Sequence, residues 1–174
     1  MENMQNKHGM QHSSKNGADK SAHSFAMYKR FGIMAIAMFG AMYFIMYAMI
    51  DKLANLIPNI NNLYMTLLMT SAMLLIELLI MKGMYTNRKI NWGITTLSVV
   101  IGIFSWFGIR QQIGVGDKQF VKGMIPHHAA ALQMSENAKL TDPELVQLQK
   151  DIIQSQSDEI ELMKRKLKEF EKEK

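Results

Sequence analysis

The sequence contains no cysteine. This absence excludes disulfide bonds and every metal site that is built on thiolate ligands. Any chemistry with soft metal ions must therefore use methionine thioethers and histidine imidazoles. The 174 residues include 17 methionines, although methionine is not among the commonest residues of proteins.

Charge is nearly missing from the middle of the chain. Only seven residues between positions 31 and 110 are charged, whereas both flanks are strongly polar. Three apolar segments lie there, at about 31–50, 63–81 and 92–109, and each approaches the ~20 residues that a helix needs to cross a bilayer. A soluble bundle of three buried helices would need polar faces, which these segments lack. The sequence predicts three transmembrane helices.

The expected fold class is all-α, with three parts. Residues 1–26 read as a disordered polar tail, residues 27–113 as the three-helix transmembrane region, and residues 117–174 as a soluble two-helix hairpin. The first hairpin helix is expected from about Asp117 to Leu140. The second is expected to end near Phe170, after Thr141 and Glu144, which have the spacing of a capping box.

The distribution of lysine and arginine predicts the topology. The two regions on the N-terminal side of the membrane hold eight such residues: Lys7, Lys15, Lys20, Lys29, Arg30, Lys82, Arg88 and Lys89. The opposite side holds four: Lys52, Arg110, Lys118 and Lys122. Because cytoplasmic loops carry the excess of positive charge, we expect a multi-pass protein of the cell membrane with a cytoplasmic N-terminus and an extracytoplasmic hairpin. Because the basic residues lie mainly beside the apolar segments and along the last helix, membrane topology explains the net charge of +5. The expected partner is therefore the lipid bilayer and not nucleic acid.

A methionine–histidine motif lies in the first hairpin helix. At about 100° per residue, two thioethers, one imidazole and a small residue fall within about 80° of one helix face; they are Met124, His127, Ala131 and Met134. His128 lies about 100° from its neighbour. The inward face of the second helix is expected to consist of Leu145, Leu148, Ile152, Gln156, Glu159, Met163, Leu167 and Phe170. Gln156 and Glu159 interrupt it, and could serve as acceptors that orient a metal-bound histidine.

Thioethers and imidazoles without thiolates favour Cu(I) and, by chemical similarity, Ag(I). Zinc ranks lower because it takes cysteine, histidine or carboxylate ligands. The alternative is that Met124, Met134 and Met163 are ordinary core residues, since methionine fills irregular gaps. Adjacent histidines that follow a methionine, opposite a methionine and a glutamate, favour the metal site.

The pattern Phe120-x-x-x-Met124-Ile125-Pro126-His127-His128-x-x-Ala131-x-x-Met134 resembles the signature of the CopM-like family of copper-binding proteins. The second helix continues the resemblance with Asp142-Pro143-Glu144 and Asp151-Ile152-Ile153-x-x-Gln156-x-x-Glu159-Ile160-x-x-Met163, so that it covers about 117–168. The family is catalogued as a domain of unknown function with a ferritin-like helical fold.

The resemblance implies an extracytoplasmic protein that binds copper or silver and supports metal resistance. The metal ligands it implies are Met124, His127, His128, Met134 and Met163. This chain departs from longer members in its three added membrane helices and its single hairpin, which is half of a four-helix bundle. We therefore expect a homo-oligomer in which two copies pair to complete the bundle.

Methionines also recur within the membrane segments. The first segment has Met34, Met38, Met42, Met46 and Met49 on one face, and the second has Met65, Met69, Met73 and Met81, with Glu77 in the gap. These side chains can simply face lipid or pack between helices. Alternatively, Met38, Met42, Met69, Met73 and Glu77 could form a path for a soft metal ion. His8, Met10, His12 and His23 of the tail could capture metal in the cytoplasm.

The leading hypothesis is a membrane-anchored copper-binding protein for sequestration, handover and resistance, with another copper-handling protein as a possible partner. It is not expected to be an enzyme, because the sequence has no recognisable nucleophile–base pair, phosphate loop or Glu-x-x-His di-iron motif. Two alternatives remain. One is a subunit of an oligomeric copper transporter, and the other is an assembly protein that docks a partner through its basic last helix.

Overall fold

The computed structural model describes residues 25–172, and every regular element in this range is helical. The elements are an N-terminal helix Phe25–Ile45, a short 3-10 helix η1 Leu53–Asn55, α2 Ile60–Ile80, α3 Arg88–Gln111, α4 Asp117–Asn137 and α5 Pro143–Lys172. The four His and Met residues of the tail lie outside the described residues.

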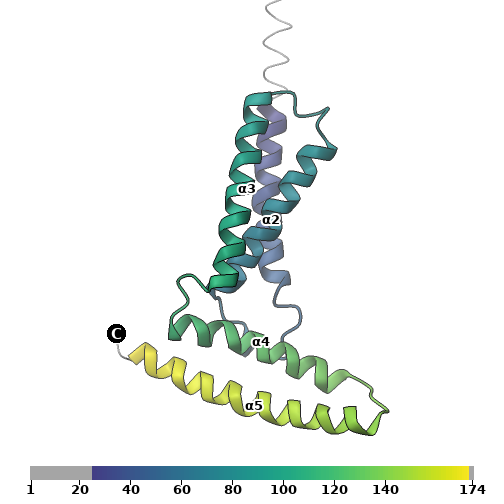
Figure 1. Ribbon diagram of the computed structural model, residues 1–174, viewed down its shortest axis with the longest axis vertical. Helices are drawn as coiled ribbons and strands as arrows, with labels where there is room; N and C mark the ends of the chain where they lie inside the picture. The colour runs from purple at the N-terminus through teal and green to yellow at the C-terminus, as the bar shows by residue number, and fades with distance from the viewer. Residues whose placement is uncertain (1–24, 173–174) are drawn as a thin grey trace, which may run out of the picture.

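The helices form two groups that meet at one end (Figure 1). The N-terminal helix, α2 and α3 make an upright bundle, and α4 and α5 lie across its lower end. The three bundle helices are each long and apolar enough to cross a membrane. The prediction of three helices of membrane-spanning length and composition is therefore confirmed.

The first bundle helix ends earlier than the apolar run that suggested it. The run continues to Ile50, but the helix ends at Ile45. The amides of Tyr47 and Ala48 then bond to carbonyls three residues back, at 3.0 and 2.9 Å. Tyr47 is buried, and its hydroxyl donates to the carbonyl of Ile57 at 3.1 Å. This bond holds a tight turn at the end of the bundle nearest α4.

Small and hydroxyl side chains form the contact between α2 and α3. Five hydroxyl side chains of these two helices are buried: Thr66, Thr70, Ser71, Ser98 and Ser105. A Cβ added at Gly102 would lie 3.0 Å from the Ser71 hydroxyl, and one added at Gly108 would lie 3.0 Å from the Tyr64 ring. Small residues let helix backbones approach closely, as membrane helices do where they associate.

This close approach predicts that Gly108→Ala destabilises the bundle. The new methyl group would press on the Tyr64 ring, whose hydroxyl donates to the Ile113 carbonyl at 2.9 Å, and such overpacking typically costs about 1–3 kcal/mol. Gly93→Ala is the matched control, because it lies in the same helix with nothing within 4 Å of the added Cβ. There the better helix propensity of alanine should stabilise by up to about 1 kcal/mol. Thermal unfolding in detergent measures both variants, and equal shifts would contradict the close contact.

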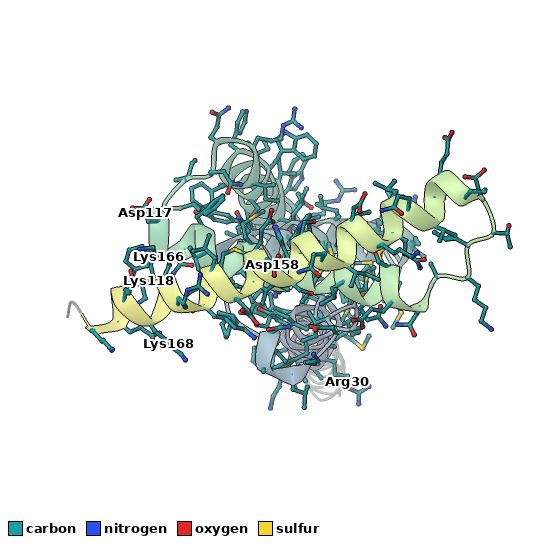
Figure 2. The ribbon with its side chains drawn as sticks, turned by 90° about the horizontal axis from the view of Figure 1, so that it is seen from below. Arg30, Asp117, Lys118, Asp158, Lys166 and Lys168 are labelled. Atoms are coloured by element: carbon teal, nitrogen blue, oxygen red, sulfur yellow. The ribbon has the colours of Figure 1, made fainter. Side chains whose placement is uncertain are left out.

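The pair formed by α4 and α5, called the α4–α5 pair below, has its own small core. Ala129, Leu132 and Ile160 form its buried centre, with Ile153 and Met163 packed against them. Figure 2 views this pair from below, with Lys118 at the start of α4 beside Lys166 and Lys168 near the end of α5, so the two helices run antiparallel.

The face of α5 that contacts α4 agrees with the predicted one only in part. Glu159 and Met163 of the predicted face contact α4 or the core that it forms, as do Ile153 and Ile160 outside that face. Leu145 and Leu148 of the predicted face are instead 48% and 52% exposed. The helix carries two apolar stripes, offset by one residue, and both have the spacing of a helical face. Only the packing shows which stripe α4 covers.

The start of α5 is also capped differently from the prediction. The side chain of Asp142 accepts from the amides of Glu144 and Leu145 at 3.0 and 3.1 Å. Asp142 is thus the residue that caps the helix, one position after the predicted Thr141. A short carboxylate at this position satisfies two amides that have no partner within the helix.

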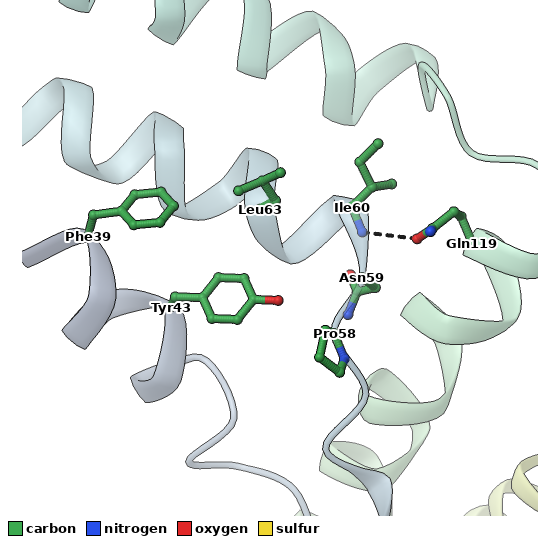
Figure 3. Close-up of a pocket in the computed structure, with 7 residues that line it drawn as sticks. All are labelled: Phe39, Tyr43, Pro58, Asn59, Ile60, Leu63 and Gln119. Atoms are coloured by element: carbon green, nitrogen blue, oxygen red, sulfur yellow. Dashed lines mark hydrogen bonds between the residues drawn. The ribbon is translucent and has the colours of Figure 1, made fainter. Parts of the chain in front are cut away.

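The N-terminal half of α4 is fastened to the start of α2. The amide of Ile60 donates to the Gln119 side chain at 3.2 Å (Figure 3). A Cβ added at Gly123 would lie only 3.5 Å from the Asn61 side-chain nitrogen. α4 begins nine residues before Pro126 and continues past it as one helix. α4 is therefore contacted on two sides, by the bundle and by α5.

Candidate metal site

His128 lies at the centre of the contact between α4 and α5. It is buried, at 8% exposure, and its Nδ1 atom is 3.0 Å from the Met124 carbonyl oxygen one turn earlier. Because a carbonyl can only accept, Nδ1 must carry a proton. The Nε2 atom is 2.6 Å from a carboxylate oxygen of Glu159 on α5. The carbonyl therefore fixes the ring and aims its second nitrogen at the neighbouring helix.

His127 points to another side of α4. It is exposed and lines a cavity at the end of the bundle. The centroids of the His127 and His128 rings are 5.9 Å apart, with the planes at 60°. The two adjacent imidazoles thus serve different surfaces of one helix.

The three predicted methionine ligands have different surroundings. Met124 is half-buried one turn before His128, and Met163 is half-buried against the core of the α4–α5 pair. Met134 is 55% exposed. Gln156 is half-buried on α5, one turn before Ile160. Within one chain the structure brings His128 and Glu159 into contact, and it leaves Met134 facing outward.

Within residues 25–172, no three His, Asp or Glu side chains gather closely enough to hold a metal ion. Thioethers lie in the same region: Met124 is one turn before His128, and Met163 packs against the core of the α4–α5 pair. Copper(I) and Ag(I) accept such ligands.

The methionines of the predicted membrane path are all at least partly exposed in the part of the chain that the structure describes. Met38 and Met42 are half-buried, and the Thr70 hydroxyl lies 4.0 Å from the Met42 sulfur. Met69 and Met73, on α2, are each 39% exposed. A path along these residues would be open on the side of α2 that faces away from the bundle.

Glu77, at the far end of this set, has a hydrogen-bond partner. The Tyr85 hydroxyl donates to its carboxylate at 3.0 Å. Burial of Tyr85, together with this bond to Glu77, raises the pKa of Tyr85 to about 12. The hydroxyl stays protonated at physiological pH and remains a donor to Glu77.

Sequence reasoning missed two features of this region. The first is the Met124 carbonyl as the partner of His128, although the four-residue spacing places a side chain beside the carbonyl one turn earlier. The second is the group of residues that surrounds His127 at the end of the bundle. No local pattern indicates that group, because its members come from three separate segments.

The comparisons with known proteins distinguish the C-terminal helices from the rest of the chain. Residues 110–170 match the family described as "Domain of unknown function (DUF305)", which includes all of α4 and most of α5. The chain is also 35% identical over 134 residues to "Uncharacterized protein L153" of Acanthamoeba polyphaga mimivirus. That match covers 75% of this chain and 86% of the viral protein. No solved structure matches the chain.

The match to the viral protein is longer than the DUF305 segment. Three quarters of the chain exceeds the stretch from residue 110 to the end, so the similarity must include a large part of the apolar helices. The chain belongs to the family of this mimivirus protein, and its residues 110–170 match DUF305.

Proposed function

We propose that the protein is a membrane-anchored, extracytoplasmic copper-binding protein that sequesters Cu(I) or hands it to another copper-handling protein. Metal resistance is the cellular role that such binding would serve. The proposed ligands are Met124, His127, His128, Met134 and Met163, with Gln156 and Glu159 as neighbouring polar groups.

The orientation of His128 carries this proposal. Metal-bound histidines almost always donate their other ring N–H to a carbonyl, a carboxylate or water. His128 already makes such a bond, from Nδ1 to the Met124 carbonyl. Its Nε2 atom faces α5 beside Glu159, so a cation that replaces the proton on Nε2 would meet an oriented ligand and a nearby negative charge.

An ion pair between His128 and Glu159, with no metal bound, would also explain why these two side chains are in contact. The thioethers favour the metal instead, because Met124 lies one turn before His128 on α4 and Met163 lies one turn after Glu159 on α5. An ion pair with only a structural role would give no reason for methionines at both of these positions. The absence of cysteine makes these thioethers the softest ligands that the chain can offer.

The excess of basic residues supports the proposed location. Lys29 and Arg30 lie near the start of the N-terminal helix, Lys82 follows the end of α2, and Arg88 and Lys89 begin α3. These helix ends lie at the end of the bundle away from the α4–α5 pair (Figure 1). The pair lies at the opposite end. By the positive-inside rule, this arrangement favours the extracytoplasmic side for α4 and α5.

The second apolar stripe of α5 supports pairing of two copies. Leu148 and Leu162 are each about half exposed, and they lie within about 40° of each other on the helix, away from the buried Ile160. A second α4–α5 pair packed on this face would complete a four-helix, ferritin-like bundle. Glu159 also follows this stripe, so the partner would cover the side of the candidate site that is exposed in one chain.

Metal competition on the purified full chain tests the function. The chain in detergent is titrated with Cu(I), Ag(I) and Zn(II), each against a chelator of known affinity. We expect Cu(I) and Ag(I) to bind far more tightly than Zn(II), because thioethers favour soft ions. A preference for Zn(II), or equal binding by a variant with Met124→Leu and Met163→Leu, would contradict the proposal.

A further inference from the structure

The junction between the bundle and α4 holds a group of sulfur and nitrogen ligands, of which only His127 belongs to the predicted set. A cavity of about 390 Å³ lies there. Three thioethers and one imidazole line it: Met46, Met49, Met65 and His127. We propose that these four side chains form a second binding site for a soft monovalent cation, Cu(I) or Ag(I), called the junction site below.

The ligands come from three segments that the fold brings together. Met46 and Met49 lie on the turn after the N-terminal helix, which the buried Tyr47 holds in place. Met65 lies in the second turn of α2. His127 reaches the cavity from α4, because the Gln119 contact and the close approach of Gly123 hold α4 against the start of α2.

The chemistry of the lining selects the class of ion. Within the described residues, the cavity lining contains no Asp, Glu, Lys or Arg side chain. Hard divalent ions such as Mg²⁺ and Ca²⁺ need several oxygen ligands, usually including carboxylates. Three neutral thioethers and an imidazole favour Cu(I) or Ag(I). A single positive charge also needs less compensation than a divalent ion where no anionic ligand is present.

The three methionines are free to close on an ion. Met46, Met49 and Met65 are 38%, 50% and 40% exposed, so their side chains are not fixed in a packed core. Methionine has three rotatable bonds and adapts its sulfur position to its surroundings.

The rim of the cavity is more rigid than the methionines. Asn61 and Gln112 exchange hydrogen bonds of 3.0 and 3.3 Å. The Gln112 backbone lies in the left-handed region, at φ 51°, where residues other than glycine are uncommon. This amide pair joins the start of α2 to the end of α3 beside the ligands.

The junction site gives the two adjacent histidines separate roles. His127 would bind an ion on the bundle side of α4, and His128 would bind one on the α5 side. With the ring centroids 5.9 Å apart, an ion released by one imidazole has the other as its nearest nitrogen ligand. The choice of Cu(I) or Ag(I) at the junction site rests on the proposed function. The experiments below distinguish the junction site from the site at the α4–α5 pair.

Silver binding to the full chain in detergent tests the junction site. The triple variant Met46→Leu, Met49→Leu, Met65→Leu removes the three sulfurs at nearly constant volume. We expect it to bind about one Ag(I) fewer per chain than the unmodified protein, since it loses one complete set of soft ligands. Equilibrium dialysis with metal analysis gives the stoichiometry, and thermal unfolding without metal shows whether the variant is folded.

A matched control removes the same number of sulfurs elsewhere. Met34, Met81 and Met84 belong neither to this cavity nor to the predicted membrane path. The triple leucine variant of these three should bind as much Ag(I) as the unmodified chain. Equal losses in both triple variants would overturn the junction site.

A second variant separates this inference from the proposed function. The changes Met124→Leu, His128→Ala, Met134→Leu and Met163→Leu remove the ligands of the α4–α5 pair and leave the junction intact. X-ray absorption of Ag(I) bound to this variant should show three sulfur neighbours and one nitrogen neighbour. If it binds no Ag(I) while the junction variant binds normally, the junction site is overturned and the proposed function stands. If it keeps one Ag(I) that the added junction changes remove, the junction site is supported independently.

Discussion

His128→Ala is expected to lower the Cu(I) affinity of the full chain by more than about 100-fold at the α4–α5 site. Removing only an outer hydrogen-bond partner of a metal ligand typically costs about 10–100-fold in affinity. His128 is proposed as the ligand itself, oriented by its bond to the Met124 carbonyl. Its loss removes the nitrogen ligand and leaves Glu159 without its partner.

Thermal unfolding with Ag(I) gives a sensitive measurement of this loss. Free metal at 100 times its dissociation constant stabilises a protein by about 2.7 kcal/mol. If the dissociation constant rises 100-fold, the same concentration stabilises by only about 0.4 kcal/mol. The shift in melting temperature that Ag(I) produces should therefore nearly disappear in His128→Ala. To keep the readout specific, the comparison is made in the triple leucine variant that lacks the junction sulfurs.

Glu159→Gln is the control that separates metal binding from an ion pair. Glutamine keeps a polar group beside His128 but removes the charge. If the contact is only an ion pair, both substitutions should lower stability without metal, and neither should alter the response to Ag(I). In the metal-binding case, His128→Ala loses the response and Glu159→Gln keeps a large part of it. An undiminished response to Ag(I) in His128→Ala would contradict the proposed site.

The sequence predicted the bundle helices better than their contacts. Length and apolar composition were enough to find three helices of membrane-spanning type, because a bilayer selects for these two properties. The small residues that join α2 to α3, such as Gly102 and Gly108, carry no such signal. Their role depends on a neighbouring helix, which a single segment does not reveal.

In the α4–α5 pair, too, the sequence predicted the helices but not which of their faces are in contact. Leu148 and Ile153 belong to different apolar stripes of α5, and helical periodicity alone favours neither as the contacting face. The separation of His127 from His128 follows from the two-sided packing of α4. Helical geometry predicted the angle between these two side chains, but the identity of their neighbours required the arrangement of the bundle.

The exposed apolar face of α5 predicts that two copies of the chain associate through it. The double variant Leu148→Glu, Leu162→Glu is expected to weaken self-association of the full chain by several hundred-fold. Both side chains are about half exposed, so covering each would contribute about 1 kcal/mol. Two copies contribute four such leucines, and about 4 kcal/mol corresponds to several hundred-fold in a dissociation constant. Glutamates at these positions would also face each other across the partner surface.

Sedimentation in density-matched detergent measures the association directly. The control variant Ala138→Glu, Leu140→Glu adds the same two charges in the exposed segment between α4 and α5, away from the stripe, and should associate like the unmodified chain. Because the substituted leucines do not belong to the α4–α5 core, the double variant should unfold at nearly the same temperature as the monomeric protein. If the unmodified chain is monomeric in detergent and in membrane crosslinking at low expression, completion of a bundle by a second copy is contradicted. If the double variant becomes monomeric and also binds Ag(I) more weakly at the α4–α5 site, the partner helix must help to form that site, as the position of Glu159 at the edge of the stripe leads us to expect.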